Sequence, residues 1–399
     1  MSRRFDLCFV GLKCYDVLAG KPVPKYLGGI ERVFVALARS MSASGLDVAF
    51  VTYDEGQDDV EVHDGITVLK AHDADAGVPV LRLLHPRMTA VWRAMRSANA
   101  RYYLQMGAGV ETFAVAAGVR AMVRNGSRFV YCVASNLDCE KELRGIDSRH
   151  ERLLYPLGLR RAHHVVAQTE SQAAMLRSNF GLEARVIAMP FEALAPGADG
   201  EAAADETLAG RRLLDRAEAA FAGFDVLWVG RVVEPKRLEW LLELAELMPE
   251  ATFHVVGTAN KASDYSRNLV ARATRLANVR VHGRLSQQDL AAFYAGAFVL
   301  CCTSSVEGFP TTFLEAWKVG VPVVSTFDPD GIIERRQAGV AVDSVGELRS
   351  AILELRSDRD RYVLLSRNAA ELYREQYAPD AIVRRYVELL SVEPPGSGA

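Results

Sequence analysis

The feature that most constrains the fold is an alternation of short apolar runs with helical periodicity along the first half of the chain. Helical periodicity lies between several of the runs, as in residues 30–44 and 111–125. Short buried strands that alternate with helices build parallel sheets from βαβ units. The pattern therefore predicts an α/β domain. The strand-like runs begin near Phe5, Leu46, Ile66, Tyr102, Phe129, His164 and Ala184.

The alternation breaks near residue 191 and then restarts. Residues 196–205 are small, polar and acidic, which is typical of a linker, and we place the linker over residues 196–220. Strand-like runs return at residues 225–230, 252–257, 279–283, 298–302 and 321–325. A chain of 399 residues is too long for one ordinary core. The sequence therefore predicts two doubly wound, Rossmann-like domains, residues 1–195 and 221–377.

Cysteine usage and charge exclude several classes of protein. The six cysteines form no Cys-x-x-Cys pair and no metal-ligand spacing, so we expect a reducing, cytoplasmic compartment. The formal net charge of −3 gives no argument for a nucleic-acid partner. The first apolar run is too short for a signal peptide, and no run approaches the roughly 18 apolar residues of a membrane span.

The strongest motif begins at Glu307, where a buried strand gives way to a loop and a helix. Thr311 and Thr312 place free backbone N–H groups at the N-terminus of that helix, which is a ready site for phosphate. Glu307 lies on the loop and Glu315 lies about one turn into the helix. In doubly wound folds ligands bind outside the carboxyl ends of the strands, so both carboxylates can point into a central cleft between the domains. On spacing alone, a capped surface helix with two solvated acids fits equally well.

A second motif, from Gly230 to Lys236, joins a buried strand to an amphipathic helix. Arg231 and Lys236 can both reach a diphosphate at the point where the strand order reverses. Two cations there would neutralise the charge that grows on a leaving group. Taken alone, the segment also fits an ordinary solvated loop.

The third motif, Gly28-Gly29, precedes the first long helix. Paired glycines let the backbone approach an anion or a sugar closely. The segment lacks the Gly-x-Gly-x-x-Gly order, which argues against dinucleotide binding. A flexible turn is the simpler interpretation of this pair by itself.

Together the three motifs resemble the retaining glycosyltransferases of the GT-B fold, commonly called family 4, over nearly the whole chain. The resemblance implies that Glu307 binds hydroxyls of the donor sugar beside the reacting carbon and that Glu315 binds the ribose. Arg231 and Lys236 would hold the diphosphate, and these two cations with Glu307 would form the catalytic set. The other donor-binding positions that it implies are Gly28, Gly29, Gly230, Gly283, Arg284, Leu285, Gly308, Phe309, Pro310, Thr311 and Thr312.

The resemblance also implies the reaction. A sugar passes from a UDP- or GDP-sugar to a saccharide or lipid-linked acceptor, with retention of configuration and without a metal or other cofactor. The setting would be cell-surface polysaccharide or glycolipid biosynthesis. Residues 1–195 would bind the acceptor and residues 221–377 the donor. The amphipathic segment 378–392, which follows a break at Pro379, would pack back on the N-terminal domain.

One departure from the family concerns the acceptor side. Many relatives carry a histidine after the fifth strand of the N-terminal domain, whereas this chain has Asn136 and Asp138 there. We expect these two residues near the acceptor. For Asp138, capping of the next helix is the simpler interpretation.

Segment 81–101 is basic and apolar and contains no acid. Met88, Val91 and Met95 recur at helical spacing, and the arginines lie mainly elsewhere on the turn. Such a helix can rest on anionic lipid at the cytoplasmic membrane face. The other interpretation is a helix with its apolar side in the core and its basic side in solvent.

Two other functions stay open. A nucleotide-sugar epimerase would keep the GT-B fold but should lack the pair of Glu307 and Glu315 in this loop. A non-catalytic partner subunit would also keep the fold, but it would not need Arg231, Lys236 and both glutamates. Measuring donor binding by calorimetry separates such a subunit from an enzyme.

Overall fold

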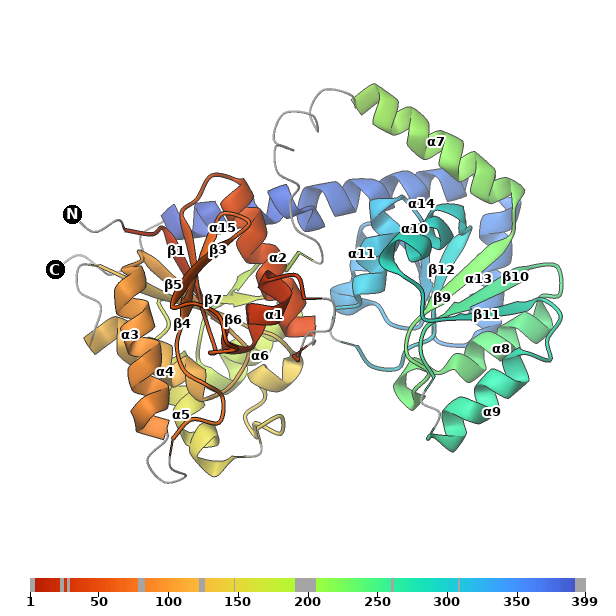
Figure 1. Ribbon diagram of the computed structural model, residues 1–399. Coiled ribbons are helices and arrows are strands. Elements are labelled where there is room, and N and C mark those ends of the chain that lie inside the picture. The colour runs from red at the N-terminus through yellow and green to blue at the C-terminus, as the bar shows by residue number, and fades with distance from the viewer. Residues whose placement is uncertain are drawn as a thin grey trace. The chain divides into compact units, whose positions relative to one another are not determined.

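The computed structural model describes two compact units, each with its own sheet (Figure 1). Unit 1 comprises Met1–Gly200 with Ala378–Ala399, and unit 2 comprises Glu201–Tyr377. The two separate, mainly parallel sheets confirm the expectation of two Rossmann-like α/β domains. The residues described are 4–21, 25–26, 29–77, 83–121, 126–146, 148–190, 206–259, 262–307 and 309–391.

Unit 1 contains an 8-stranded sheet in the order β3-β4-β2-β1-β5-β6-β7-β8. Its neighbouring strands pair in parallel except for β3 with β4. The strand order reverses between β1 and β5, which is where ligands bind in doubly wound sheets. The strands are β1 Leu7–Val10, β2 Val48–Thr52, β3 Val60–His63, β4 Ile66–Lys70, β5 Tyr102–Met106, β6 Arg128–Cys132, β7 His164–Ala167 and β8 Arg185–Val186.

Helices join these strands and cover the sheet (Figure 1). The last helix, α15, contacts α2 within unit 1, and its Tyr386 hydroxyl lies 3.6 Å from the Cys132 sulfur. Segment 378–391 therefore lies on the same unit as the N-terminal strands. The helices are α1 Tyr15–Leu18, α2 Gly29–Ala43, α3 Thr89–Ala98, α4 Val110–Ala121, α5 Arg149–Leu159, α6 Glu170–Phe180 and α15 Pro379–Ser391.

Strand β3 was not among the strands predicted from the sequence. This strand alternates exposed and half-buried residues and forms the antiparallel edge of the sheet, so it lacks the apolar run of a buried strand. Asp64 and Gly65, which join it to β4, have positive φ angles of 49° and 78°. Asp-Gly between two strand-forming segments is a strong hairpin signal. That dipeptide could have revealed the strand.

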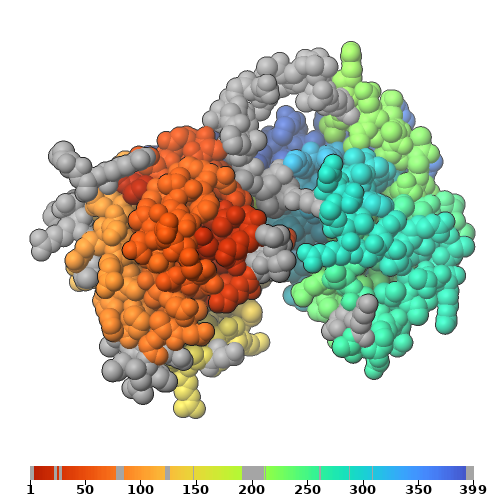
Figure 2. Space-filling model, viewed as in Figure 1, coloured from red at the N-terminus to blue at the C-terminus, as the bar shows by residue number. Residues whose placement is uncertain are grey.

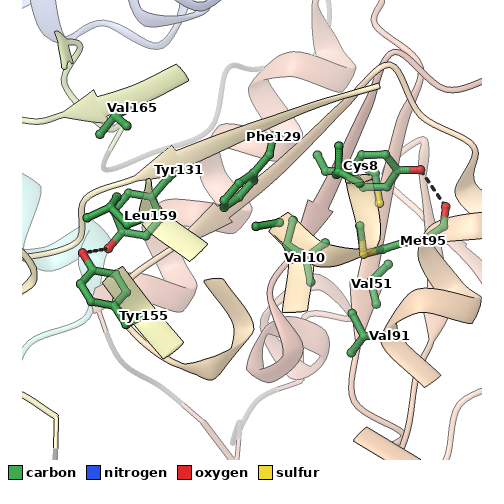
Figure 3. Close-up of a cluster of buried hydrophobic side chains, with 14 of the residues drawn as sticks. Cys8, Val10, Val51, Val91, Met95, Phe129, Tyr131, Tyr155, Leu159 and Val165 are labelled. Atoms are coloured by element: carbon green, nitrogen blue, oxygen red, sulfur yellow. Dashed lines mark hydrogen bonds between the residues drawn. The ribbon is translucent and has the colours of Figure 1, made fainter. Parts of the chain in front are cut away.

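The core of unit 1 fixes the inner faces of α3 and α5. In Figure 3, Tyr155 and Leu159 of α5 lie beside Tyr131 of β6, and Val91 and Met95 of α3 lie on the same side as Val51. The Tyr155 hydroxyl lies 3.0 Å from the Tyr131 hydroxyl and donates to a backbone carbonyl 2.8 Å away. Because buried tyrosine hydroxyls need such partners, these bonds fix the rotation of α5 about its axis.

Segment 81–101 presents its apolar side to this core. Met88, Val91 and Met95 are buried, and half-buried Trp92 donates from Nε1 to a backbone carbonyl of α4 at 2.7 Å. The finding supports the core-facing interpretation, since the apolar side of α3 is covered by protein and is not available to lipid. The first two residues of the segment lie outside the described residues.

Unit 2 contains a 6-stranded sheet in the order β11-β10-β9-β12-β13-β14, in which every pair is parallel. In chain order this is the Rossmann arrangement, and the strand order reverses between β9 and β12. The strands are β9 Asp225–Val229, β10 Thr252–Val256, β11 Val279–Gly283, β12 Val299–Cys302, β13 Val323–Ser325 and β14 Gly339–Ala341. The helices are α7 Glu206–Ala222, α8 Leu238–Leu247, α9 Asp264–Ala273, α10 Gln287–Gly296, α11 Thr311–Lys318, α12 Ile332–Arg335, α13 Val345–Ser357 and α14 Arg359–Leu372.

Helix α7 corrects the predicted linker at residues 196–220. The helix contacts α10 and α14, and its residues Ala217 and Ala220 are buried. Arg216 donates to the Tyr362 hydroxyl at 3.1 Å, which ties the helix to unit 2. Alanine and charged residues form helices readily, and residues 206–220, which we included in the linker, belong to a packed helix. Residues 191–205 lie outside the described residues.

No helix in the described part of the chain is long and apolar enough to cross a bilayer.

Candidate active site

Two loops of unit 2 meet where its strand order reverses. One loop follows β9 and begins at Gly230, and the other follows β12 and begins at Thr303. Their strands are neighbours in the sheet, so both loops leave the same edge at the same place. The backbone of Ser305 donates to the carbonyl of Pro235 at 2.8 Å, which joins the two loops directly.

The start of the first loop depends on a glycine at the end of the neighbouring strand β10. Gly257, at the end of β10, has a φ of 148°, and a Cβ added there would overlap the carbonyl oxygen of Gly230. The Gly230 N–H donates to the Val256 carbonyl at 3.0 Å, and the Gly257 N–H donates to the Gly283 carbonyl at 2.8 Å. This close approach of backbones fixes the start of the Gly230 loop. Arg231, the next residue, is exposed.

Replacing Gly257 by alanine is therefore expected to destabilise unit 2 by about 3 kcal/mol or more, because it adds both steric overlap and backbone strain. Gly296→Ala is the matched control, since a Cβ at Gly296 meets nothing within 4 Å. That variant should change stability by less than about 1 kcal/mol. Thermal or urea unfolding of both variants gives the comparison, and equal midpoints would contradict the close approach at Gly257.

Lys236 and Glu307 form an ion pair between the two loops. The Glu307 Oε1 also accepts a hydrogen bond from the Ser304 hydroxyl at 2.7 Å. The side chains of Lys236 and Glu307 are 23% and 15% exposed, so their charges are only partly screened by water. The structure thus brings together the cation of one motif and the acid of another.

Arg237, which was not among the predicted site residues, links the two loops by hydrogen bonds. It adopts a left-handed conformation with φ of 46°. Its guanidinium donates to the carbonyls of Thr303 at 2.6 Å and Ser304 at 3.1 Å and to the Thr326 hydroxyl at 2.8 Å. Because these three acceptors follow β12 and β13, Arg237 positions the loop that carries Glu307. A basic residue directly after the Lys236 motif was the only signal in the sequence.

Helix α11 presents its N-terminus on the same loop. Pro310 is the N-cap residue, and no side chain of the described residues caps the helix. The first backbone N–H groups, at exposed Thr311 and half-buried Thr312, can therefore receive an anion. Phe309 packs against Tyr377 with ring centroids 5.1 Å apart. Gly308 lies outside the described residues.

Glu315 lies one turn further along α11, and its carboxylate accepts a hydrogen bond from Tyr294 of α10 at 2.8 Å. Tyr294 is buried, and burial followed by the charge of Glu315 raises the pKa of its hydroxyl well above the usual value. The hydroxyl therefore stays protonated and remains a donor to Glu315. Tyr294 is a second residue that the sequence analysis missed, because it lies in a separate helix with no motif around it.

Strand β11 ends at Gly283, and the loop after it carries exposed Arg284 and half-buried Leu285. His282 lies within β11, and its ring Nε2 is 2.9 Å from the ring Nδ1 of His254. The other ring nitrogen of His254 is 3.3 Å from a carboxylate oxygen of Asp225. Burial, and then the charge of His254, lower the pKa of His282. No group of three or more metal-ligating side chains was found among the described residues.

Unit 1 has a cavity of about 330 Å³ where its own strand order reverses. Gly11 follows β1 at its wall, and Lys13, Glu31, Glu111 and Asp138 add charged groups to the lining. Of the predicted glycine pair, Gly28 lies outside the described residues. Gly29 begins α2, and a Cβ added there would meet no described atom within 4 Å.

Asp138 lines this cavity but is mainly engaged with the chain itself. Its carboxylate accepts from the N–H of Ala134 at 2.7 Å and from Ser135, as the acidic member of a capping box. Burial raises the pKa of the carboxyl. Asn136 is exposed, and its side-chain oxygen accepts from Gln172 at 3.0 Å. Asp138 thus takes part in capping the short helix Asn136–Cys139, in which Ser135 is the N-cap residue, and this supports the capping interpretation.

Comparison with known proteins identifies the chain. Residues 223–358 match the family described as glycosyl transferases group 1, and residues 28–192 match the glycosyl transferase 4-like domain. The chain belongs to the group 1 glycosyl transferases. Each match falls within one of the two units. The first covers the loops that carry Lys236 and Glu307, and the second covers the strands of unit 1 from β2 to β8.

Relatives agree with this family. The chain is 29% identical over 178 residues to the lipopolysaccharide core biosynthesis glycosyltransferase LpsE of Rhizobium meliloti strain 1021, covering 42% of this chain and 50% of LpsE. The chain thus spans only about half the length of that relative.

Solved structures share the fold. The structure of Anabaena Alr3699/HepE in complex with UDP matches with a TM-score of 0.68 and 18% identity, covering 97% of this chain and 99% of that one. Sucrose-phosphate synthase from Thermosynechococcus elongatus matches with a TM-score of 0.64 and 17% identity, covering 97% and 98%. These likenesses confirm the GT-B fold.

Proposed function

We propose that this group 1 glycosyl transferase moves a sugar from a nucleoside diphosphate sugar, with retention of anomeric configuration, to a saccharide or lipid-linked acceptor. The observation that carries the proposal is the pairing of Lys236 with Glu307 beside the uncapped N-terminus of α11. A cation and backbone N–H groups suit a diphosphate. A carboxylate at the same place suits a sugar whose reacting carbon becomes positively charged.

Each residue has a role in this proposal. Lys236 and exposed Arg231 hold the diphosphate and stabilise the charge that develops as it departs. Glu307 holds hydroxyls of the donor sugar, and Glu315, supported by Tyr294, holds the ribose. Arg237 does not touch the donor in this scheme; it positions the loop that carries Glu307.

The donor and the acceptor are supported by relatives. HepE was solved with UDP, which favours a UDP-sugar over a GDP-sugar. LpsE is named for lipopolysaccharide core biosynthesis, which favours an acceptor of cell-surface polysaccharide or glycolipid. All six cysteines are buried free thiols, which supports a reducing, cytoplasmic setting.

A screen of nucleotides by thermal unfolding tests the proposal. A nucleotide present at 100 times its Kd should stabilise the chain by about 2.7 kcal/mol. We expect UDP to stabilise the wild-type chain and to stabilise Glu315→Gln much less, whereas adenosine and inorganic phosphate should do little. No stabilisation by UDP, GDP or ADP would sink the proposed donor class.

Transfer is expected to persist in EDTA. Lys236, Arg231 and the α11 N-terminus supply the positive potential that a divalent ion supplies elsewhere. The measurement is the initial rate of sugar transfer with EDTA and again with added Mg²⁺ or Mn²⁺. A rate that falls in EDTA and recovers with either ion would overturn the metal-free mechanism.

A further inference from the structure

Helix α5 presents a basic and apolar face that nothing described in unit 1 covers. Leu153 and Leu157, one turn apart, are 68% and 37% exposed. Four arginines are also exposed at the two ends of this stretch: Arg149, Arg152, Arg160 and Arg161. The yellow part of unit 1, to which α5 belongs, reaches the molecular surface in Figure 2.

The rotation of α5 separates this outer face from an inner one. Tyr155 and Leu159 are buried beside Tyr131, as Figure 3 shows. At 3.6 residues per turn, Glu151 falls toward that inner side and is half-buried. The outer face of α5 carries Arg149, Arg152 and the two leucines. It therefore contains no acid among the described residues.

The arginines keep their charge on the outer face. Arg161 donates to the carbonyl of Leu157 at 2.6 Å, and Arg152 donates to the carbonyl of Ile146 at 2.5 Å. Within the described residues no carboxylate pairs with any of the four. Backbone carbonyls orient these groups without neutralising them. Among the described residues, the face therefore carries positive charge that no ion pair offsets around an apolar centre.

We propose that the outer face of α5 docks on an anionic lipid surface. Leucines at the centre suit the boundary between headgroups and acyl chains, where amphipathic helices insert their apolar side. Guanidinium groups around them suit lipid phosphates, which they bind with two parallel hydrogen bonds. A nucleic acid would use the arginines but would leave the leucines exposed, so a lipid surface matches both parts of the face. The proposal stands independently of the donor chemistry of unit 2.

The proposal assigns lipid contact to α5 in place of α3. The two helices share a basic character, but Val91 and Met95 of α3 are buried in the core, whereas Leu153 and Leu157 of α5 point to solvent. The rotation of each helix, and not its composition, makes this difference.

Cosedimentation of the full chain with vesicles tests the proposal. We expect binding to vesicles of phosphatidylcholine with phosphatidylglycerol, weak binding to phosphatidylcholine alone, and loss of binding at high salt. Arg149→Glu with Arg160→Glu should lower the apparent affinity at least about 25-fold, taking about fivefold per arginine near an anionic surface. Leu153→Ser with Leu157→Ser should lower it about tenfold or more.

Matched controls lie in unit 2. Arg275→Glu with Arg374→Glu changes the net charge equally at exposed positions, and Leu247→Ser with Leu364→Ser removes two leucines that are 47% and 46% exposed. Both control variants should bind vesicles as the wild type does, and thermal unfolding should show that all four variants are folded. Three results would each overturn the proposal. These are a wild type that fails to bind anionic vesicles, a wild type that binds neutral vesicles with the same affinity, and two α5 variants that both bind as the wild type does.

Discussion

Replacing Glu307 by glutamine is expected to lower kcat about 10²-fold or more while changing donor affinity much less. Transfer with retention places positive charge on the anomeric carbon as the diphosphate departs, and a fixed carboxylate stabilises that charge mainly in the transition state. Ser304 and Lys236 hold the Glu307 carboxylate in one orientation. Glutamine keeps the size and most hydrogen bonds of the side chain but removes its charge.

The comparison variant for this prediction is Glu315→Gln. In the wild type the Glu315 carboxylate, on α11, accepts a hydrogen bond from Tyr294 of α10. That change should weaken nucleotide binding more than it slows turnover. The measurements are kcat and donor Kd for both variants. If Glu307→Gln kept a normal kcat while its donor Kd rose, the two glutamates would have exchanged roles or the site would lie elsewhere.

Replacing Lys236 by alanine is expected to lower kcat/KM about 10³-fold, with losses in both donor affinity and kcat. The cation serves the diphosphate in the ground state and in the transition state. Its loss also leaves Glu307, only 15% exposed, without its counter-ion. An unpaired carboxylate beside an incoming diphosphate repels it, which adds to the loss of attraction.

Donor Kd from calorimetry and kcat from initial rates measure the two parts of this effect. Arg275→Ala, which removes an exposed cation elsewhere in unit 2, is the control and should leave both quantities unchanged. Unaltered kinetics in Lys236→Ala would remove the residue from the site. A loss of affinity with normal kcat would limit its role to binding.

Much of the candidate site could be predicted from the sequence because each motif is local. A strand followed by a glycine and a basic segment, or by an acid and a helix start, places polar groups at the carboxyl edge of a sheet. The sequence could not show that Lys236 and Glu307 touch, since 71 positions separate them. That contact exists because β9 and β12 are neighbours in the sheet.

The missed residues share one property. Arg237 and Tyr294 act through partners that lie far away in the chain, namely Ser304 with Thr326 for Arg237 and Glu315 for Tyr294. No local pattern marks them, because an arginine after a lysine and a tyrosine in an alanine-rich helix are both common. Only the packing of α10 on α11, and of the two loops on each other, gives them a function.

By itself the sequence determined the two α/β domains, the sheet edges that carry the candidate site and the residue types found there. Those features follow from side-chain periodicity and backbone capping, which act over a few residues. The tertiary structure alone decided which charges pair, that α7 is a packed helix, and which side of α3 and of α5 is covered. Burial of a helix face depends on the neighbour that packs against it. That neighbour is set by strand order, so two basic helices of similar composition can turn opposite faces to solvent.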